Sequence, residues 1–159
     1  PDFKYLGVPK EGESKTFSSP VDIAYGAQGQ FNFKYGFTGD IEFNEQNFGD
    51  PIPGQVKVVL IREPAEFVLL KNSSFLQNVS GLFKSHSKGY NYTATGLPIG
   101  LKINGSTGVI AGTSSVSGEI LVQIHATEKE TNGQTFTSYI KITVNSPPPR
   151  FNSYIARYH

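Results

Sequence analysis

Alternating hydrophobic and polar positions run through the first half of the chain and predict β-strands. Residues 30–35 alternate aromatic with polar side chains, and residues 38–44 repeat this period of two. The link 36–39 has the length of a hairpin turn. Residues 55–63 are β-branched and nearly all apolar, which is typical of a more central strand. A shorter strand is expected at 21–25.

The same alternation predicts which side chains face the core. Phe31, Phe33 and Tyr35 fall on one face of the strand at 30–35, so we expect them inside. Asn32 and Lys34 fall on the opposite face and are expected to point outward.

The second half contains the two longest alternating runs, residues 119–127 and 135–144. The polar turn between them includes Asn132-Gly133, which predicts a hairpin. Shorter strands are expected upstream, at 67–70, 91–94, 100–103 and 109–111. No convincing apolar 3.6-residue periodicity indicates a helix. The pattern therefore predicts an all-β protein.

Composition agrees with this class and limits the available chemistry. The chain has 159 residues, enough for one large domain or two small ones. Its 12 Phe, 8 Tyr, 17 Gly and 10 Pro are unlike a disordered chain or a helical bundle. Cys, Met and Trp are absent, which excludes disulfides, thiol nucleophiles and Cys-based zinc sites.

The charge balance argues against polyanionic partners. A net charge of +1 favours neither nucleic acid nor an anionic membrane surface. No apolar run reaches the ~18 residues that membrane insertion requires. The chain begins with Pro1, which favours a processed protein or a fragment of a longer one.

A change in composition predicts a domain boundary near Glu63 and Pro64. Residues 1–63 carry nine acidic and six basic side chains, whereas residues 64–146 carry four and six. We therefore predict two small β-sandwich-like domains, 1–63 and 64–146. A Pro-rich spacer and tail follow at 147–159.

The second half resembles the immunoglobulin/cadherin-like module of extracellular surface proteins. The resemblance rests on GLPIGLKI (96–103), TGVIAGT (107–113) and Gly118, followed by the two long strands. Four glycines are expected to supply turn conformations, and four apolar residues to point inward. These are Gly96, Gly100, Gly108 and Gly112, and Leu97, Leu101, Ile103 and Ile110. The resemblance implies an extracellular spacer or adhesion role without catalysis.

The first half resembles a small β domain appended to secreted bacterial polysaccharide-active enzymes. The shared residues are YGAxGxF (25–31), GxI (39–41) and FGDPIPGxVK (48–57). That family usually has two cysteines where this chain has Phe43 and Val59, so an apolar contact would replace a disulfide. The resemblance implies an accessory, carbohydrate-binding role.

Polar side chains gather within eleven residues at a strand end and the following turn, and could bind sugar hydroxyls. They are Asp40, Glu42, Asn44, Glu45, Asn47 and Asp50. Of these, Asp40, Glu42 and Asp50 could hold Ca²⁺; no other cofactor is expected. A solvated polar face is the alternative interpretation.

Tyrosine rings are the second candidate ligand group, since a ring can stack on the apolar face of a pyranose. Tyr25 and Tyr35 are the main candidates, and Tyr90 and Tyr92 are the secondary ones. Core packing is the alternative for each ring.

Four N-x-S/T sequons at Asn72, Asn78, Asn91 and Asn104 would mark glycosylated loops in a secreted eukaryotic protein. Chance is the alternative in a segment so rich in Asn, Ser and Thr.

Enzyme activity is not expected. His86, His125 and His159 show no metal-ligand spacing, and no GxSxG motif is present.

The leading hypothesis is a secreted or cell-surface, non-catalytic, lectin-like protein whose partner is a glycan. The alternative is a structural or cell-adhesion protein that binds protein partners or itself. In that case the tail 147–159 would dock on a neighbouring copy and form a homo-oligomer.

Overall fold

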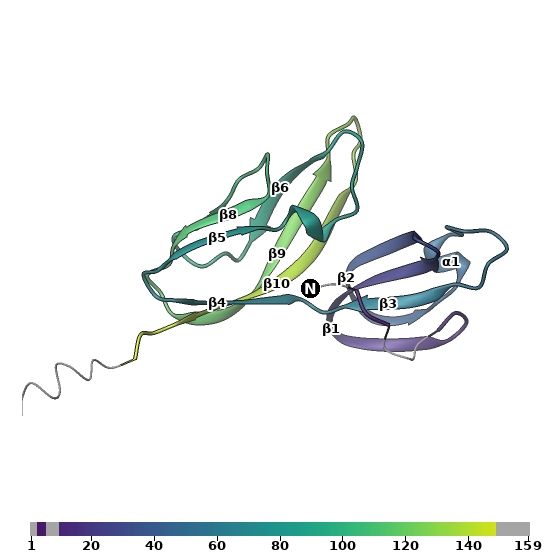
Figure 1. The fold of residues 1–159 in the computed structure, drawn as a ribbon, viewed down its shortest axis with the longest axis horizontal. Coiled ribbons are helices and arrows are strands. Elements are labelled where there is room, and N and C mark those ends of the chain that lie inside the picture. The colour runs from purple at the N-terminus through teal and green to yellow at the C-terminus, as the bar shows by residue number, and fades with distance from the viewer. Residues whose placement is uncertain (1–2, 6–9, 149–159) are drawn as a thin grey trace, which may run out of the picture.

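The protein is built almost entirely of β-strands (Figure 1). The structure is a computed structural model that describes residues 3–5 and 10–148. In chain order its elements are β1 (Ser14–Ala27), β2 (Gln30–Glu42), α1 (Glu45–Phe48), β3 (Val58–Arg62), β4 (Ala65–Leu70), β5 (Ser74–Asn78), η1 (Ser80–Leu82), β6 (Tyr90–Thr95), β7 (Leu101–Ile103), β8 (Val109–Thr113), β9 (Gly118–Glu128) and β10 (Thr135–Asn145). The all-β class is confirmed, with one turn of α-helix and a short 3₁₀ helix η1 among these residues.

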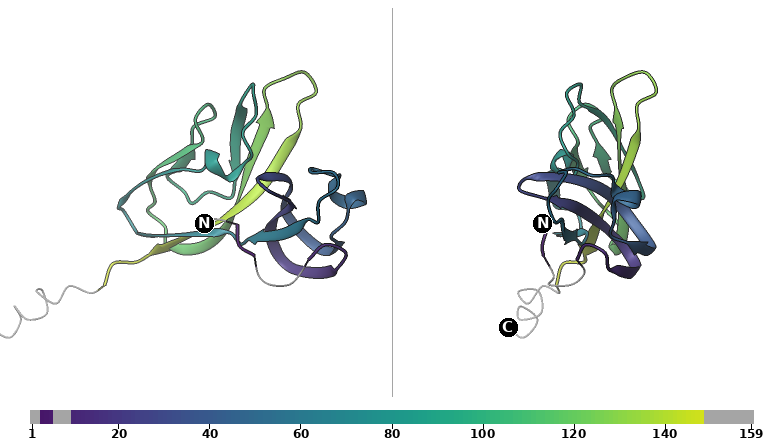
Figure 2. Two further views of the ribbon diagram at one scale, coloured as in Figure 1. Left: turned by 45° about the vertical axis from the view of Figure 1, so that its right-hand side comes forward. Right: turned by 90° about the vertical axis from the view of Figure 1, so that its right-hand side faces the viewer.

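The strands form three sheets. The N-terminal sheet has the order β2-β1-β3 and is antiparallel. The second and third sheets, β4-β10-β9-β6 and β5-β8-β7, make the sandwich, in which β4 runs parallel to β10. Figures 1 and 2 show the sandwich beside the N-terminal sheet. The described N-terminal part is thus a single sheet, not the expected small sandwich.

Strand β2 corrects the predicted hairpin at residues 36–39. Instead of reversing there, the chain continues as one strand that pairs with β1 from Gln30 to Glu42. Gly36 and Gly39 have φ of 58° and 100°, and the pairing shifts register nearby. The glycines therefore accommodate an irregularity in a long strand rather than a turn.

Strand β1, not β3, is the central strand of the N-terminal sheet. It extends well beyond the expected 21–25, whereas β3 lies at the edge, where Lys4 forms an isolated bridge to Ile61. Val59 and Ile61 of β3 face the core, and Arg62 is also buried. On the other face Leu60 is half-buried and Val58 is 38% exposed, so burial explains only part of the apolar run.

Two hydrophobic clusters form the core. The N-terminal cluster contains Phe17, Val21, Ile23, Tyr25, Ile41, Phe43, Phe48, Val59 and Ile61. Phe43 and Val59 both have no exposed surface and belong to this one cluster, where the resemblance puts a disulfide in relatives. The larger cluster fills the sandwich between its two sheets. Of the expected inward residues, Leu101 and Ile110 are buried in this cluster, and Leu97 and Ile103 are partly buried and pack against it.

The predicted β9–β10 hairpin is confirmed. Its register runs from Thr127 opposite Thr135 to Gly118 opposite Val144. All four glycines predicted to lie in turns have positive φ, but Gly112 lies within strand β8, where it pairs with Phe75 and Leu101, so the turn prediction is wrong for that residue. At Gly100 the constraint is also steric, because an added Cβ would lie 1.9 Å from the carbonyl oxygen of Thr113.

A buried ion pair joins the N-terminal sheet to the sandwich. Asp22 of β1 and Arg62 of β3 pair at 2.7 Å, both with less than a tenth of the side chain exposed. Ser138 of β10 donates to Asp22 Oδ2 at 2.6 Å, and Arg62 Nη2 donates to the carbonyl of Leu82 at 2.6 Å. The backbone N–H of Gly36 donates to Asp22 Oδ1 at 2.8 Å. Both parts therefore share one buried polar network.

A second contact completes the junction. Tyr35 of β2 packs its ring against Phe83 and Phe136, with ring centroids 5.2 and 5.7 Å apart. Its hydroxyl accepts the N–H of Lys84 at 2.7 Å. Tyr35 thus packs on the core of the sandwich rather than that of its own sheet.

Candidate functional site

A cleft lies beside this junction, with walls from the N-terminal sheet and from the sandwich. Its volume is about 270 Å³. The aromatic part is lined by Phe33, Tyr35, Tyr90 and Phe136. The polar part includes Lys84, His86 and Glu128, which come from the segment between η1 and β6 and from the end of β9. Rings and hydrogen-bonding groups therefore line one hollow.

Phe33 and Tyr35 form the aromatic wall contributed by β2. They are two residues apart on a strand, so they share a face, and their rings stack at 5.7 Å with an angle of 7° between planes. The prediction that Phe31, Phe33 and Tyr35 lie in the core is wrong: all three are half-buried. Tyr35 instead meets the sandwich, and Phe33 lines the cleft beside it.

Burial, the largest cause, raises the pKa of Tyr35 to about 12. The phenol therefore keeps its proton at neutral pH. Because the hydroxyl oxygen already accepts the N–H of Lys84, its own proton is left to donate a further hydrogen bond.

The polar part of the cleft is held by backbone contacts. The Lys84 ammonium donates to the carbonyl of Phe31 at 3.4 Å and lies 6.0 Å from the Phe33 ring centroid. The hydroxyl of Tyr90 donates to the Lys84 carbonyl at 2.6 Å. These bonds fix the segment that carries His86.

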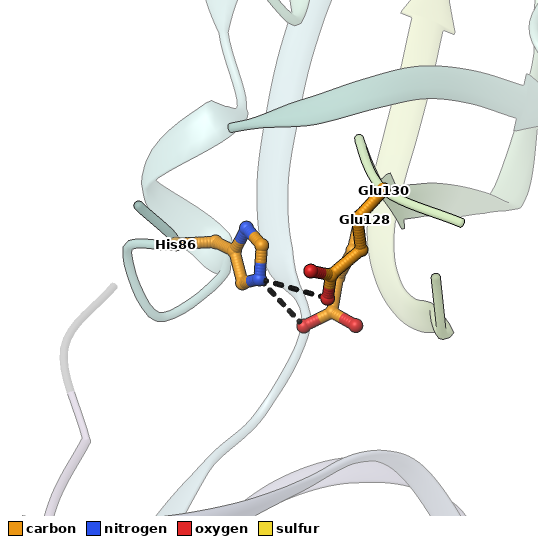
Figure 3. Close-up of side chains that lie close together, drawn as sticks. All are labelled: His86, Glu128 and Glu130. Carbon is orange, nitrogen blue, oxygen red and sulfur yellow. Dashed lines mark ion pairs between the residues drawn. The ribbon is translucent and has the colours of Figure 1, made fainter. Parts of the chain in front are cut away.

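His86, Glu128 and Glu130 lie close together (Figure 3), and the first two also line the cleft. His86 Nε2 lies 3.2 Å from Glu128 Oε2 and 3.4 Å from Glu130 Oε1. One ligand atom from each residue lies within 4.8 Å of the others. Within residues 3–5 and 10–148, this is the one group of three or more His, Asp or Glu side chains that could hold a metal ion.

The predicted polar group at 40–50 serves local structure. Asn44 caps α1, with its Oδ1 accepting the N–H of Asn47 at 3.0 Å, and its Nδ2 donates to Glu42. The side-chain amide of Asn47 donates to the carbonyl of Glu42 at 2.8 Å. The Thr16 hydroxyl donates to Asp40.

Lys57 forms ion pairs with the two remaining carboxylates of this group, Glu45 and Asp50. Its ammonium lies 2.9 Å from Asp50 and 3.6 Å from Glu45, and 3% of its side chain is exposed. Asp40, Glu42 and Asp50 are not brought together as one set of metal ligands. The structure therefore gives these six residues capping and pairing contacts, and none of them lines the cleft.

We expect Asp50→Asn to make the protein less sensitive to acid. The hydrogen bond from Lys57, the largest cause, lowers the pKa of Asp50 below its ordinary value. A lowered folded-state pKa contributes stability above the ordinary Asp pKa of about 3.9, and this is lost as the pH falls further.

Urea midpoints at pH 7 and pH 3 test this. The drop between the two pH values should be smaller for Asp50→Asn than for the wild type. Asp40→Asn, which leaves the Lys57–Asp50 pair intact, is the control, and its drop should be larger than that of Asp50→Asn. An unchanged drop in Asp50→Asn would contradict the structural role.

Tyr25 has no exposed surface and therefore cannot contact a glycan, so the prediction of a ligand-binding role is wrong for this residue. Its hydroxyl donates to Glu11 at 3.2 Å, and burial, the largest cause, raises its pKa to about 12. Tyr90 and Tyr92 are also buried, although Tyr90 contributes to the cleft lining. Of the two main tyrosine candidates and the polar group at 40–50, Tyr35 alone lines the cleft.

The sequence does not identify the other cleft residues. Alternation places Phe33 in the core, and His86 has no partner at ligand spacing along the chain. Glu128 lies 42 positions from His86 and meets it only because β6 pairs with β9. No local signal could have found this contact.

The four sequon asparagines Asn72, Asn78, Asn91 and Asn104 are all exposed. Asn78 and Asn104 accept backbone N–H groups through Oδ1. Their Nδ2 atoms, where a glycan would be attached, take no part in these hydrogen bonds. Their glycosylation stays a prediction.

Two further predictions concern membranes and the tail. No helix within the described residues is long and apolar enough to cross a membrane. The predicted docking tail lies outside the described residues from position 149 onward.

Two facing sheets around one core, with one parallel and otherwise antiparallel pairing, define the sandwich as an Ig-like β-domain. The family model described as "Putative Ig domain" matches residues 57–145, more than half of the chain. The chain belongs to this family. Comparison with curated proteins gave no match.

Two solved structures were found to be similar to part of the chain. A putative alpha-galactosidase from Bacteroides fragilis is 20% identical, with a TM-score of 0.43, over 52% of this chain and 16% of that one. Mouse cadherin-23 EC22-24 is 9% identical, with a TM-score of 0.36, over 80% of this chain and 53% of that one. The chain thus spans less than two thirds of either protein's length.

Proposed function

We propose that this protein is a non-catalytic, extracellular carbohydrate-binding module that holds a glycan in the cleft between the N-terminal sheet and the sandwich. The observation that carries the proposal is the stacked pair Phe33 and Tyr35 beside a polar wall. Aromatic faces match the apolar C–H face of a pyranose, and nearby donors and acceptors orient its hydroxyl groups.

The available hydrogen-bonding groups suit a polyhydroxylated ligand. Tyr35 offers a phenolic proton, Lys84 an ammonium and Glu128 a carboxylate. Donors and acceptors are both needed, because each sugar hydroxyl donates and accepts. The cleft is open to solvent and small, which suits one or two sugar units and modest affinity per site.

The absence of catalysis is part of the proposal. Glycoside hydrolysis canonically uses two carboxyl groups that flank the scissile bond. Among the described residues, Glu128 is the one carboxylate in the cleft lining; Glu130 beside it contacts the same His86 nitrogen, so the two carboxylates lie on one side and do not flank a bound ligand. This arrangement favours binding over hydrolysis.

Phe33→Ala is expected to weaken glycan binding at least about tenfold, because a lost stacking face removes roughly 1.4 kcal/mol or more. A glycan array first identifies the ligand, and isothermal titration then measures its affinity. Phe31→Ala is the matched control: it removes a half-buried ring from the same strand, outside the cleft lining. Equal affinity of the two variants, or an array without binding, would overturn the proposal.

A second candidate is a structural or adhesion module that associates with another copy of itself. It is favoured by an apolar hollow of about 260 Å³ at the opposite end of the β9–β10 hairpin. Ile99, Val116 and Ile120 line it with 72%, 50% and 38% of their surfaces exposed. An array without binding, together with a dimeric mass by light scattering, would replace the first candidate with the second.

A further inference from the structure

We propose that His86, Glu128 and Glu130 form a zinc-binding site at the rim of the cleft. The proposal does not depend on glycan binding, since the metal alone is the ligand. It rests on three side chains from two segments that the fold brings together, with His86 before β6 and the two glutamates at the end of β9 and just beyond it.

The spacing of the three side chains fits tetrahedral zinc. Two ligand atoms about 2.0–2.1 Å from a zinc ion, at a tetrahedral angle, lie about 3.4 Å apart. The distances from His86 Nε2 to the carboxylate oxygens of Glu128 and Glu130 are 3.2 and 3.4 Å. Figure 3 shows the imidazole facing both carboxylates. The ligand atoms of Glu128 and Glu130 lie within 4.8 Å of each other, so small side-chain movements would bring all three groups to zinc-binding distance.

The surrounding backbone holds the two glutamates in place. Glu128 Oε1 accepts the N–H of Gln134 at 3.0 Å, so Oε2 is the oxygen left for the ion. The N–H of Glu130 donates to the carbonyl of Glu128 at 2.9 Å, and the backbone carbonyl of Glu130 accepts the N–H of Gly133 at 3.0 Å. A turn with these bonds presents both carboxylates on the same side. Such support by neighbouring hydrogen bonds is typical of metal ligands.

The donor set selects the class of ion. One imidazole nitrogen and two carboxylate oxygens suit Zn²⁺, whereas Ca²⁺ takes six to eight oxygen ligands. The two carboxylates balance the charge of a divalent ion. The side chains of His86 and Glu128 are 18% and 16% exposed and that of Glu130 is 35% exposed, so solvent and ions reach the site.

Zinc binding selects one tautomer of His86. The N–H of Lys88 donates to His86 Nδ1 at 3.3 Å, a contact that goes with a neutral ring whose proton lies on Nε2. Metal binding requires the Nε2 lone pair, so the ring proton moves to Nδ1 and this long contact from Lys88 is given up. The Lys88 ammonium, 3.9 Å from Glu130 and 63% exposed, is free to turn toward solvent.

Three protein ligands leave a fourth zinc position for water or another oxygen. His86 and Glu128 both line the cleft, so this position lies at the cleft rim. A hydroxyl group of a bound ligand could occupy it.

Isothermal titration of the tag-free protein with zinc chloride tests the proposal. One zinc ion per chain is expected, and His86→Ala and Glu130→Gln should each weaken its binding at least tenfold. His125→Ala and Glu119→Gln are the matched controls, because His125 bonds to Thr95 and Thr137, and Glu119 pairs with Lys141, away from the cluster. Both controls should bind zinc like the wild type.

The coordination geometry gives a second readout. Cobalt(II) added in place of zinc should produce the strong visible absorption of a tetrahedral ion, and His86→Ala should abolish it. Circular dichroism of each variant verifies folding. Absence of zinc binding by the wild type, or unchanged binding by both cluster variants, would overturn the proposal, whatever the glycan array shows.

Discussion

Arg62→Met is expected to destabilise the protein by about 3–5 kcal/mol, because it leaves the carboxylate of Asp22 buried without its cation. Asp22 would keep the Ser138 hydroxyl and the Gly36 N–H as donors, but neither carries charge. The substitution also removes the bond from Arg62 to the Leu82 carbonyl and the guanidinium that lies 4.3 Å from the Phe3 ring centroid. Both losses act at the junction.

Urea unfolding with a linear extrapolation measures this effect. The double variant Asp22→Asn/Arg62→Met should recover part of the lost stability, since no unpaired charge then stays buried. Lys141→Met is the surface control: it breaks two exposed pairs, with Glu66 and Glu119, and should leave the midpoint almost unchanged. A single variant as stable as the wild type would show that solvent reaches Asp22.

The strands of the sandwich were predictable because local patterns determine them. Residues 119–127 and 135–144 alternate over nine or more positions with a turn between them, and long alternation has one solution when one face is buried. The glycine at 100 carries a similar local signal, since a left-handed turn with no room for a Cβ admits only glycine.

The N-terminal sheet was harder to predict because its long strands are irregular. Gly36 and Gly39 look like turn residues in the sequence, but β1 is long enough to pair with β2 on both sides of them. Whether a glycine ends a strand or bends it depends on its partner strand, which local sequence does not specify.

The junction and the cleft depend on contacts between distant segments. Asp22 is 40 positions from Arg62 and 116 from Ser138. An isolated Asp in the apolar run at 21–25 is a signal that a partner exists, but it does not say which one. Alternation places Phe33 and Tyr35 on one face of a strand but does not say what covers that face. Here Tyr35 packs on the sandwich and Phe33 lines the cleft beside it.

Gly36→Ala is expected to force the N-terminal sheet away from β10. A Cβ at this position would lie 2.5 Å from the carbonyl oxygen of Thr137 and 2.9 Å from a ring carbon of Tyr139. Its φ of 58° adds a backbone cost of roughly 1 kcal/mol for alanine. Because Gly36 also donates to Asp22, the displacement would strain the buried ion pair. We expect a total loss of about 2–4 kcal/mol.

Gly39→Ala separates the steric effect from the backbone effect. Gly39 lies in the same strand with φ of 100°, yet nothing within 4 Å would meet its Cβ. Gly39→Ala should therefore cost less stability than Gly36→Ala by at least about 1 kcal/mol, even though its backbone strain is no smaller.

Hydrogen exchange of the Lys84 amide gives a local readout, because this N–H bonds to Tyr35 across the junction. Exchange should accelerate in Gly36→Ala and stay at the wild-type rate in Gly39→Ala after correction for global stability. Since the cleft has walls on both sides of the junction, its ligand affinity should fall in Gly36→Ala alone. Equal behaviour of the two variants would mean that the sheet and the sandwich do not pack tightly at Gly36.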